Sequence, residues 1–180
     1  MADIAANAYI VLWVWWREVR RRMRAITLWQ PWASLIACGA KRYETRSWVT
    51  KYRGPIAIHA ATKDPKAIFK TLPLNVKVAM SPYLIEHYLF WDDIPRGAIV
   101  ATAELVECWK ITDNGHTNGS DRAASIEGGV FEGKTNIVEG DEILFGDWTP
   151  GRYAWEIANV KILPEPIPQK GQQGLWRWDE

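Results

Sequence analysis

One short segment carries the densest set of side chains that could do chemistry. Its core is a Gly-x-Lys-x-x-Glu-x-Arg pattern in which Lys41, Glu44 and Arg46 are the charged positions. If the segment is a strand, its period of two places four side chains on one face: Arg42, Glu44, Arg46 and Trp48. Lys41 precedes the strand at a turn, where its long side chain can reach either face. The spacing therefore predicts a compact charged site.

These groups suit two kinds of chemistry. The neighbouring arginines disfavour the charged form of Lys41, which would prime its amine as a base or nucleophile with Glu44 orienting it. The same cations can instead hold a phosphate, while Trp32 or Trp48 offers a stacking surface for a base. A purely structural interpretation is a salt bridge between Glu44 and Arg46 beside a solvated lysine. The pattern alone favours this third interpretation, whereas its position after a strand, a proline and a helix favours function.

Other polar residues are candidates for the same site. Glu104 interrupts an apolar strand, and is either a second acid facing the cleft or a residue at the sheet rim. His59 ends an apolar strand, and either reaches the cleft or is a hydrogen-bonded core histidine. Arg152 is a candidate for the binding face, whereas Trp155 suits the core better. The predicted binding set is Trp32, Lys41, Arg42, Glu44, Arg46, Trp48, His59, Glu104 and Arg152, with Lys41 and Glu44 as the catalytic candidates.

Several chemistries find no support in the sequence. Ser34 has no partnered His and Asp nearby, and neither a P-loop nor a dinucleotide fingerprint is present. Cys38 and Cys108 lack Cys or His neighbours at metal-ligand spacing, and the histidines are scattered. We therefore expect two reduced thiols, no metal site and no cofactor.

Composition argues for one folded domain with a local rather than a global charge signal. A chain of 180 residues fits a single core, and its 12 tryptophans are too many to expose, so several must be buried. The net charge is only +1, so no strong field draws the whole molecule to nucleic acid. Any affinity for an anion must come from a local cluster of cations.

The first 22 residues differ in character from the rest. An apolar run from Ile4 to Trp16 precedes a group of arginines. The run is too short to span a bilayer, and a signal peptide has its basic region first. The segment reads either as an interfacial amphipathic helix or, as we favour, as an extension outside a domain that covers residues 23–178. We expect no membrane span and a cytoplasmic location.

The elements that must position the site are short and mixed. Strands are predicted over residues 24–29, 42–49, 56–60, 98–111, 143–145 and 153–162, before a proline-rich tail. Helices are predicted over 32–38, from 64 into the low 70s, and over 82–90, and a loop insertion over 112–135. This order indicates an α+β fold, a small β-barrel of five or six strands with flanking short helices.

Several ordered motifs together resemble the ASCH domain family. They are Leu-Trp-Gln-Pro-Trp-Ala-Ser at 28–34, the Gly39-to-Trp48 pattern, Arg-Gly-Pro-Ile-Ala-Ile-His-Ala at 53–60, Phe-Gly-Asp at 145–147, Gly-Arg-Tyr-Ala-Trp at 151–155 and Gly-x-x-Gly-Leu-Trp at 171–176. The resemblance spans about residues 24–177. It implies a PUA-like β-barrel with a cleft beside the Gly-x-Lys-x-x-Glu-x-Arg segment, and a role in RNA binding, RNA modification, or translation and coactivation.

Some members of that family are enzymes, and the resemblance carries over only in part. One branch resembles amidohydrolases of N-acetylcytidine that use a Lys, a Thr and a Glu. Lys41 matches their lysine, but Glu44 stands where they have the threonine, with Thr45 one residue away on the other face. Other relatives are ribonucleases for single-stranded RNA, whose lysine Lys41 also matches, while Tyr43 or Ser47 would be guesses for their remaining residues.

Three functions follow as hypotheses. The first is a module that binds single-stranded RNA or a modified nucleotide in a Lys/Arg-lined cleft. The second is a metal-independent hydrolase, acting on RNA or an N-acylated nucleoside through Lys41. The third is a protein-interaction module in a transcription or translation complex, using exposed tryptophans and the 112–135 loop.

Overall fold

The computed structural model describes residues 23–88, 90–113, 124–128 and 134–178. The predicted extension at 1–22 lies outside these residues, as does much of the predicted 112–135 loop. None of the helices in the described part is long and apolar enough to cross a bilayer.

Within the described residues the strands form one mixed sheet. Their bounds are β1 (Arg24–Leu28), β2 (Tyr43–Arg46), β3 (Gly54–Ala60), β4 (Ala98–Asp113), β5 (Ala124–Glu127), β6 (Thr135–Val138), β7 (Tyr153–Pro168) and β8 (Leu175–Arg177). The order is β2-β7-β4-β3-β1-β8, with a β5–β6 hairpin attached to β4. Among these described strands, only β1 and β3 pair in parallel. The predicted α+β class is confirmed, although the sheet has eight strands rather than five or six.

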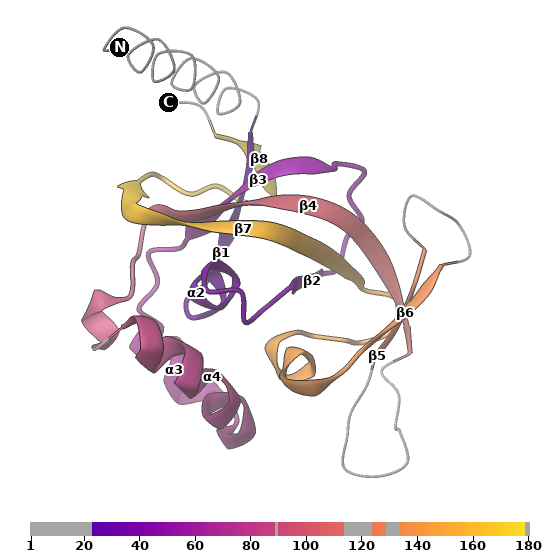
Figure 1. Cartoon of the computed structure of the whole chain (residues 1–180), viewed down its shortest axis with the longest axis horizontal. Helices are drawn as coiled ribbons and strands as arrows, with labels where there is room; N and C mark the ends of the chain where they lie inside the picture. The colour runs from indigo at the N-terminus through magenta and orange to yellow at the C-terminus, as the bar shows by residue number, and fades with distance from the viewer. Residues whose placement is uncertain (1–22, 89, 114–123, 129–133, 179–180) are drawn as a thin grey trace, which may run out of the picture.

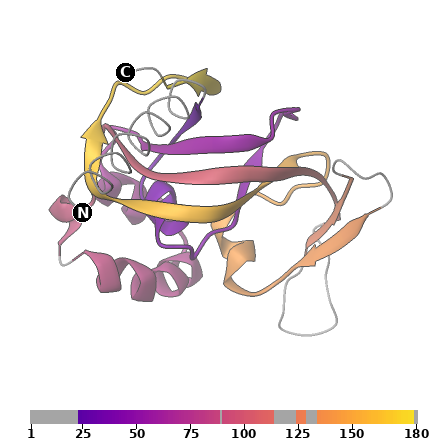
Figure 2. The same cartoon turned by 45° about the horizontal axis from the view of Figure 1, so that its top comes forward.

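The helices are α2 (Trp32–Ala37), α3 (Pro65–Thr71) and α4 (Leu74–His87), with single 3-10 turns η1 (Trp91–Asp93) and η2 (Gly140–Phe145). The long strands β3, β4 and β7 lie side by side and arch over α2, with α3 and α4 on the side of α2 away from the sheet (Figures 1 and 2). Contacts of α2 with these three strands and with α4 confirm that it is the middle layer.

The core lies between the arched sheet and α2. Residues Ala33 to Ala37 of α2 are all buried, and Ile36 packs with Ile58 of β3 and Trp155 of β7. The helix ends at Gly39, whose φ of 82° suits glycine, as the sequence predicted. Five of the tryptophans in the described part of the chain are buried, in line with the composition: Trp109, Trp148, Trp155, Trp176 and Trp178.

The sheet curls back on itself without closing by backbone pairing. β2 and β1 are four steps apart along the sheet, which would be roughly 19 Å if it were flat. Yet Arg46 of β2 donates from Nη2 to the Thr27 carbonyl of β1 at 3.2 Å. One side chain bridges this gap only because the sheet is strongly curled. In the described residues no strand pairing joins β2 to β8, so the predicted closure into a barrel is not confirmed.

Two predicted elements were wrong in kind or position. Residues 143–145 belong to the 3-10 turn η2 rather than to a strand. The helix predicted at 82–90 is α4, which begins at Leu74 and contains Pro82 in its interior. The predicted helix began at Pro82, a position in the first turn that proline favours.

Other differences concern element ends. The strand predicted at 42–49 is limited to Tyr43–Arg46. Strand β7 continues through the proline-rich tail to Pro168. β2 covers only the first four residues of β7, so the later part has a free edge, where alternating prolines cost no ladder hydrogen bond. Within the predicted 112–135 loop, Ala124–Glu127 forms β5.

Candidate functional site

Two adjoining cavities, of about 280 and 550 Å³, lie where the curled sheet brings β1 and β2 together. Both are lined by Trp29, Trp32 and Glu44, so they form one continuous cleft. Trp29 follows β1 and Trp32 begins α2, while Glu44 projects from β2. We call this feature the tryptophan cleft.

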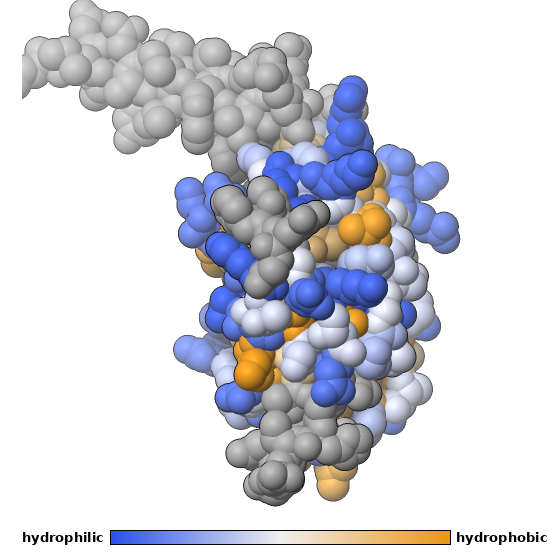
Figure 3. Space-filling view, turned by 90° about the vertical axis from the view of Figure 1, so that its right-hand side faces the viewer, coloured by the Kyte–Doolittle hydropathy of each residue, from blue (hydrophilic) through white to orange (hydrophobic). Residues whose placement is uncertain are grey.

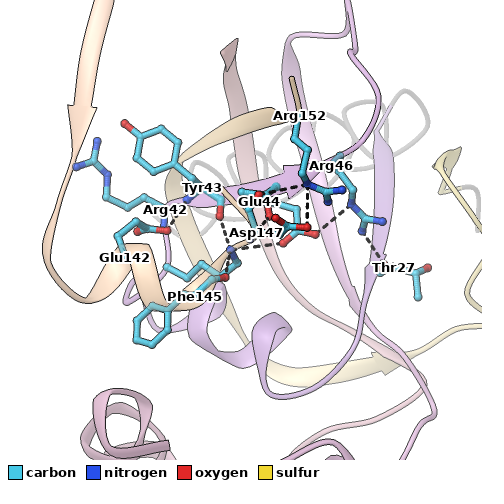
Figure 4. Close-up of polar contacts among 11 residues, drawn as sticks. Thr27, Arg42, Tyr43, Glu44, Arg46, Glu142, Phe145, Asp147 and Arg152 are labelled. Atoms are coloured by element: carbon cyan, nitrogen blue, oxygen red, sulfur yellow. Dashed lines mark hydrogen bonds and ion pairs between the residues drawn. The ribbon is translucent and has the colours of Figure 1, made fainter. Parts of the chain in front are cut away.

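The charged side chains of the cleft come from two segments, β2 and the chain between η2 and β7. Arg46 lines the smaller cavity, and Asp147 and Arg152 line the larger one. Figure 4 shows Glu44, Arg46, Asp147 and Arg152 gathered together, with Thr27 on the other side of Arg46. The walls are therefore of mixed charge, and not simply lined by Lys and Arg as the sequence suggested.

Lys41 lies beneath the cleft rather than in it. Its side chain is 1% exposed and lines neither cavity. The amine donates to the carbonyls of Tyr43 and Phe145, the latter at 2.7 Å, and lies 3.6 Å from Glu44 Oε2. Two of the three N–H donors of the ammonium are thus taken by carbonyls, and the Glu44 carboxylate is its ion-pair partner. The structure thus makes Lys41 a buried tie between β2 and η2, in contrast to the amine primed by neighbouring arginines that the sequence suggested.

Glu44 connects this buried lysine to the cleft. Its carboxylate is 13% exposed and lies between Lys41 and Arg46, with Oε1 3.0 Å from Arg46 Nε. The direction of that N–H does not meet hydrogen-bond geometry, so the contact is an ion pair and Nε has no hydrogen bond among the described residues. The predicted pairing of Glu44 with Arg46 is present, and both side chains share one face of β2.

Asp147 and Arg152 form a second charged pair at the larger cavity. Arg152 Nε lies 3.2 Å from both Asp147 Oδ2 and the Asp147 carbonyl. Hydrogen bonds from Thr149, together with the Arg152 charge, lower the pKa of Asp147. The Asp147 amide donates to Thr45 Oγ1 at 2.9 Å, which joins this loop to β2. Asp147 was not among the predicted site residues, although it ends the Phe-Gly-Asp motif at 145–147.

Glu142 is a second carboxylate near the site that was not among the predicted site residues. It accepts from the backbone amides of Arg42 at 2.7 Å and Tyr43 at 3.1 Å, and so fixes the start of β2. Burial raises the pKa of Glu142, opposed by the nearby Lys41 charge and the two amides. No local pattern indicates this role, because about a hundred residues separate the partners.

Trp29 is the most accessible aromatic ring of the cleft, with 53% of its surface exposed. The ammonium of Lys63 lies 3.8 Å from its ring centroid, a cation–π contact that covers one face. Trp32 is less exposed and packs against Phe145, with ring centroids 6.4 Å apart. Of the two, sequence reasoning selected only Trp32, because Trp29 reads there as the end of a strand.

Two predicted site residues flank β2 and lie away from the cleft. Arg42 precedes the strand, is 63% exposed, and pairs with Glu156 at 3.4 Å. Trp48 follows the strand, and its ring packs edge-on against Trp155 at 4.5 Å. The predicted four-residue face is therefore wrong at its Arg42 end, because strand periodicity holds only within Tyr43–Arg46. Trp48 stays on the Glu44 face, since Trp155 is the direct strand partner of Glu44.

His59 and Glu104 also lie elsewhere. His59 is buried under the chain before β8, where Nε2 donates to the Gln169 carbonyl at 2.9 Å. Burial lowers the pKa of His59. Glu104 is exposed on β4 and accepts from Asn159 at 2.8 Å. Neither residue lines the tryptophan cleft. Within the described residues, no group of three or more His, Cys, Asp or Glu is placed to hold a metal ion.

Comparison with known proteins agrees with the resemblance seen in the sequence. The chain matches the ASCH domain over residues 26–166 and belongs to this family. It is similar to activating signal cointegrator 1 from Homo sapiens and from Mus musculus, with 34% identity over 86 residues in both cases. The match covers 46% of this chain but only 14% of each relative.

Proposed function

We propose that this ASCH domain binds single-stranded RNA or a modified nucleotide in the tryptophan cleft. The observation that carries the proposal is one cleft in which two indole rings, Trp29 and Trp32, lie beside paired cations and carboxylates. Stacked bases and charge-assisted contacts to phosphate are the two contributions on which recognition of single strands depends. The curled sheet supports a PUA-like barrel as the scaffold of this site.

The mixed charge assigns different parts of a nucleotide to different residues. A base stacks on Trp29 or Trp32, and its exocyclic amine donates to Glu44, since carboxylates accept from base amino groups. Arg46 and Arg152 bind phosphate oxygens by exchanging part of their ion pairing for the ligand. Lys41 acts from below as a positioning residue that fixes the Glu44 carboxylate.

A binding titration with a fluorescent single-stranded RNA tests this function. The wild-type domain should bind at low salt and weaken as salt rises. Trp29→Ala should weaken binding by about 1–3 kcal/mol, the usual contribution of one stacked base. Trp29→Phe should keep most of the affinity. Lys161→Ala is the matched control, because this lysine is exposed and lines neither cavity.

Two results would contradict the proposal. One is the absence of RNA affinity in the wild-type domain at low salt. The other is binding that Trp29→Ala leaves unchanged, which would place the ligand elsewhere on the molecule.

A hydrolase is a weaker second function. The favourable observation is Glu44, a carboxylate facing the cleft beside a lysine. Against it, the Lys41 amine is held by two carbonyls and an ion pair with Glu44, and it lies outside the cleft lining. We therefore expect no product when the domain is incubated with labelled single-stranded RNA or N-acetylcytidine, with or without a chelator. Turnover that Lys41→Ala abolishes would favour the enzyme instead.

The name of the two relatives favours one further candidate function. Both are called activating signal cointegrator 1, which points to a module within a transcription complex. In that case a partner protein should remain bound in a pull-down after nuclease treatment. Release of all captured protein by nuclease would favour RNA as the primary ligand.

A further inference from the structure

A second cavity, of about 390 Å³, lies beyond the end of β2 and is separate from the tryptophan cleft. Its walls come from the chain between β2 and β3, and from the facing parts of β4, β5 and β7. The lining includes Val49, Lys51, Arg53, Lys110 and Tyr153. We call it the lysine cavity.

The lysine cavity is lined by two lysines without an ion pair among the described residues and by the carboxylate of Glu127, the strand partner of Lys110. Lys51 and Lys110 are exposed and make no ion pair with any described residue. Arg53 is different, because it pairs with Glu107 and donates to the carbonyls of Thr50 and Tyr52. Arg53 therefore shapes the wall, whereas the two lysines provide the unpaired charge.

Strand register places the two cavities on one face of the sheet. Arg46 pairs directly with Tyr153, and Tyr153 pairs directly with Lys110. Side chains of directly paired residues project to the same face. The cleft arginine, the Tyr153 ring and the lysine of the second cavity therefore form a row across β2, β7 and β4.

The chain itself also links the two cavities. Arg46 lines the tryptophan cleft, and Val49 and Lys51 line the lysine cavity only a few residues later. Between them stands Trp48, an exposed indole supported edge-on by Trp155. Aromatic and cationic side chains thus alternate from one cavity to the next. Figure 3, which looks onto the side near the β5–β6 hairpin, shows mainly hydrophilic surface with small apolar patches.

We propose that the lysine cavity is a second subsite for the same single strand. Nucleotides that leave the tryptophan cleft pass over Trp48, and Lys51 and Lys110 then bind the phosphates of the following segment. This inference rests on the proposed function of the tryptophan cleft. It adds that the ligand is a strand of several nucleotides rather than a free nucleotide, which could not reach both cavities.

The experiment compares single-stranded RNAs of about three and about eight nucleotides, a range over which such grooves fill. The wild-type domain should bind the longer strand more tightly. In the double variant Lys51→Gln/Lys110→Gln, affinity for the longer strand should fall roughly tenfold, and affinity for the shorter strand should stay the same. Loss of two phosphate contacts should also reduce the slope of log K against log salt by roughly 1.4.

A charge-matched control and an independent readout accompany this comparison. Lys161→Gln/Arg177→Gln removes two exposed cations that line neither cavity, and should bind both strands as wild type does. In wild-type protein, the longer strand should protect Lys51 and Lys110 from a lysine-acetylating reagent, and the shorter strand should not.

The outcomes separate the two proposals. If neither strand binds the wild-type domain, the proposed function fails and this inference fails with it. If both strands bind but the Lys51→Gln/Lys110→Gln variant and the acetylation pattern show no dependence on length, only the second subsite is refuted. Equal weakening of both strands in that variant would also refute it, because a separate subsite affects only the longer ligand.

Discussion

At the scale of single residues, the Gly-x-Lys-x-x-Glu-x-Arg pattern divides into a buried supporting residue and two residues that face the cleft. Lys41 is buried and ties β2 to η2, whereas Glu44 and Arg46 face the cleft. A buried ammonium is tolerable only when it is hydrogen-bonded and paired, and here two carbonyls accept its hydrogen bonds while the Glu44 carboxylate balances its charge. The residue with the strongest catalytic appearance in the sequence is therefore a positioning residue in our proposal.

Replacing Lys41 tests this role. In Lys41→Met the partly buried Glu44 carboxylate loses a cation and two buried carbonyl contacts lose their donor, so the free energy of unfolding should fall by about 3–5 kcal/mol. Urea denaturation at an unchanged m-value measures the effect. Lys51→Met, at an exposed position, should change stability by less than about 0.5 kcal/mol. A Lys41→Met domain as stable as wild type would show that Lys41 does not stabilise the contact between β2 and η2.

At the scale of elements, the cleft is built from helices, strands and turns of which local sequence patterns predicted only some. Strands β1, β3 and β4, the first part of β7 and the short helix α2 were predicted close to their observed positions, because apolar runs and Gly or Pro breaks mark them. Strands β5, β6 and β8 were not predicted. The turn η2 was predicted as a strand, although it supplies the Phe145 carbonyl to Lys41 and leads to Asp147. Its apolar residues fit either structure, and only packing beside β2 decides between them.

The segment before β8 is a second element that only the fold explains. It lies so close to β3 that a Cβ on Gly171 would come within 2.5 Å of the His59 ring. The His59 ring is buried, and its Nδ1 makes no hydrogen bond among the described residues. Protonation of this ring would place an uncompensated charge in the core.

Stability should therefore depend on pH through His59. Its folded-state pKa is lower than the unfolded value of about 6.5, so the unfolded chain binds more protons below that pH. This contribution is fully present above about pH 6.5, and is lost as the pH falls through the folded pKa. Unfolding midpoints measured from pH 7.5 to 5 should fall more steeply for wild type than for His59→Asn. Parallel curves would show that His59 does not titrate on unfolding.

At the scale of the whole molecule, curvature of one sheet creates the site. The net charge of +1 gives no general attraction to nucleic acid, so the cleft must act through local contacts. Its walls come from β1, β2 and the chain between η2 and β7, which the curl of the sheet brings together. The domain bounds of 23–178 and the cytoplasmic location stay predictions.

The two cysteines give a prediction for the whole fold. Cys38 and Cys108 are both free thiols, and burial raises the pKa of each. Because the thiolate is the reactive form, both should react slowly with a thiol reagent in the native domain and rapidly after unfolding. The melting temperature should be the same with and without a reductant. A disulfide found by mass spectrometry of the native, non-reduced domain would contradict this expectation.

The sequence alone determined the local framework of this protein. It predicted the α+β class, the helix stop at Gly39, the pairing of Glu44 with Arg46 on one strand face, and the family resemblance. Each of these follows from short-range periodicity, from glycine and proline geometry, or from the order of motifs along the chain. Such signals need no knowledge of how distant segments meet.

Only the tertiary structure decided which of these residues share a site. It buried Lys41, brought Trp29, Asp147 and Arg152 to the cleft, and kept His59 and Glu104 away from it. The physical reason is that burial and long-range contact depend on how far the sheet curls. That curvature is set by the packing of the whole core and by bridges such as Arg46 to Thr27, which no local window of sequence contains.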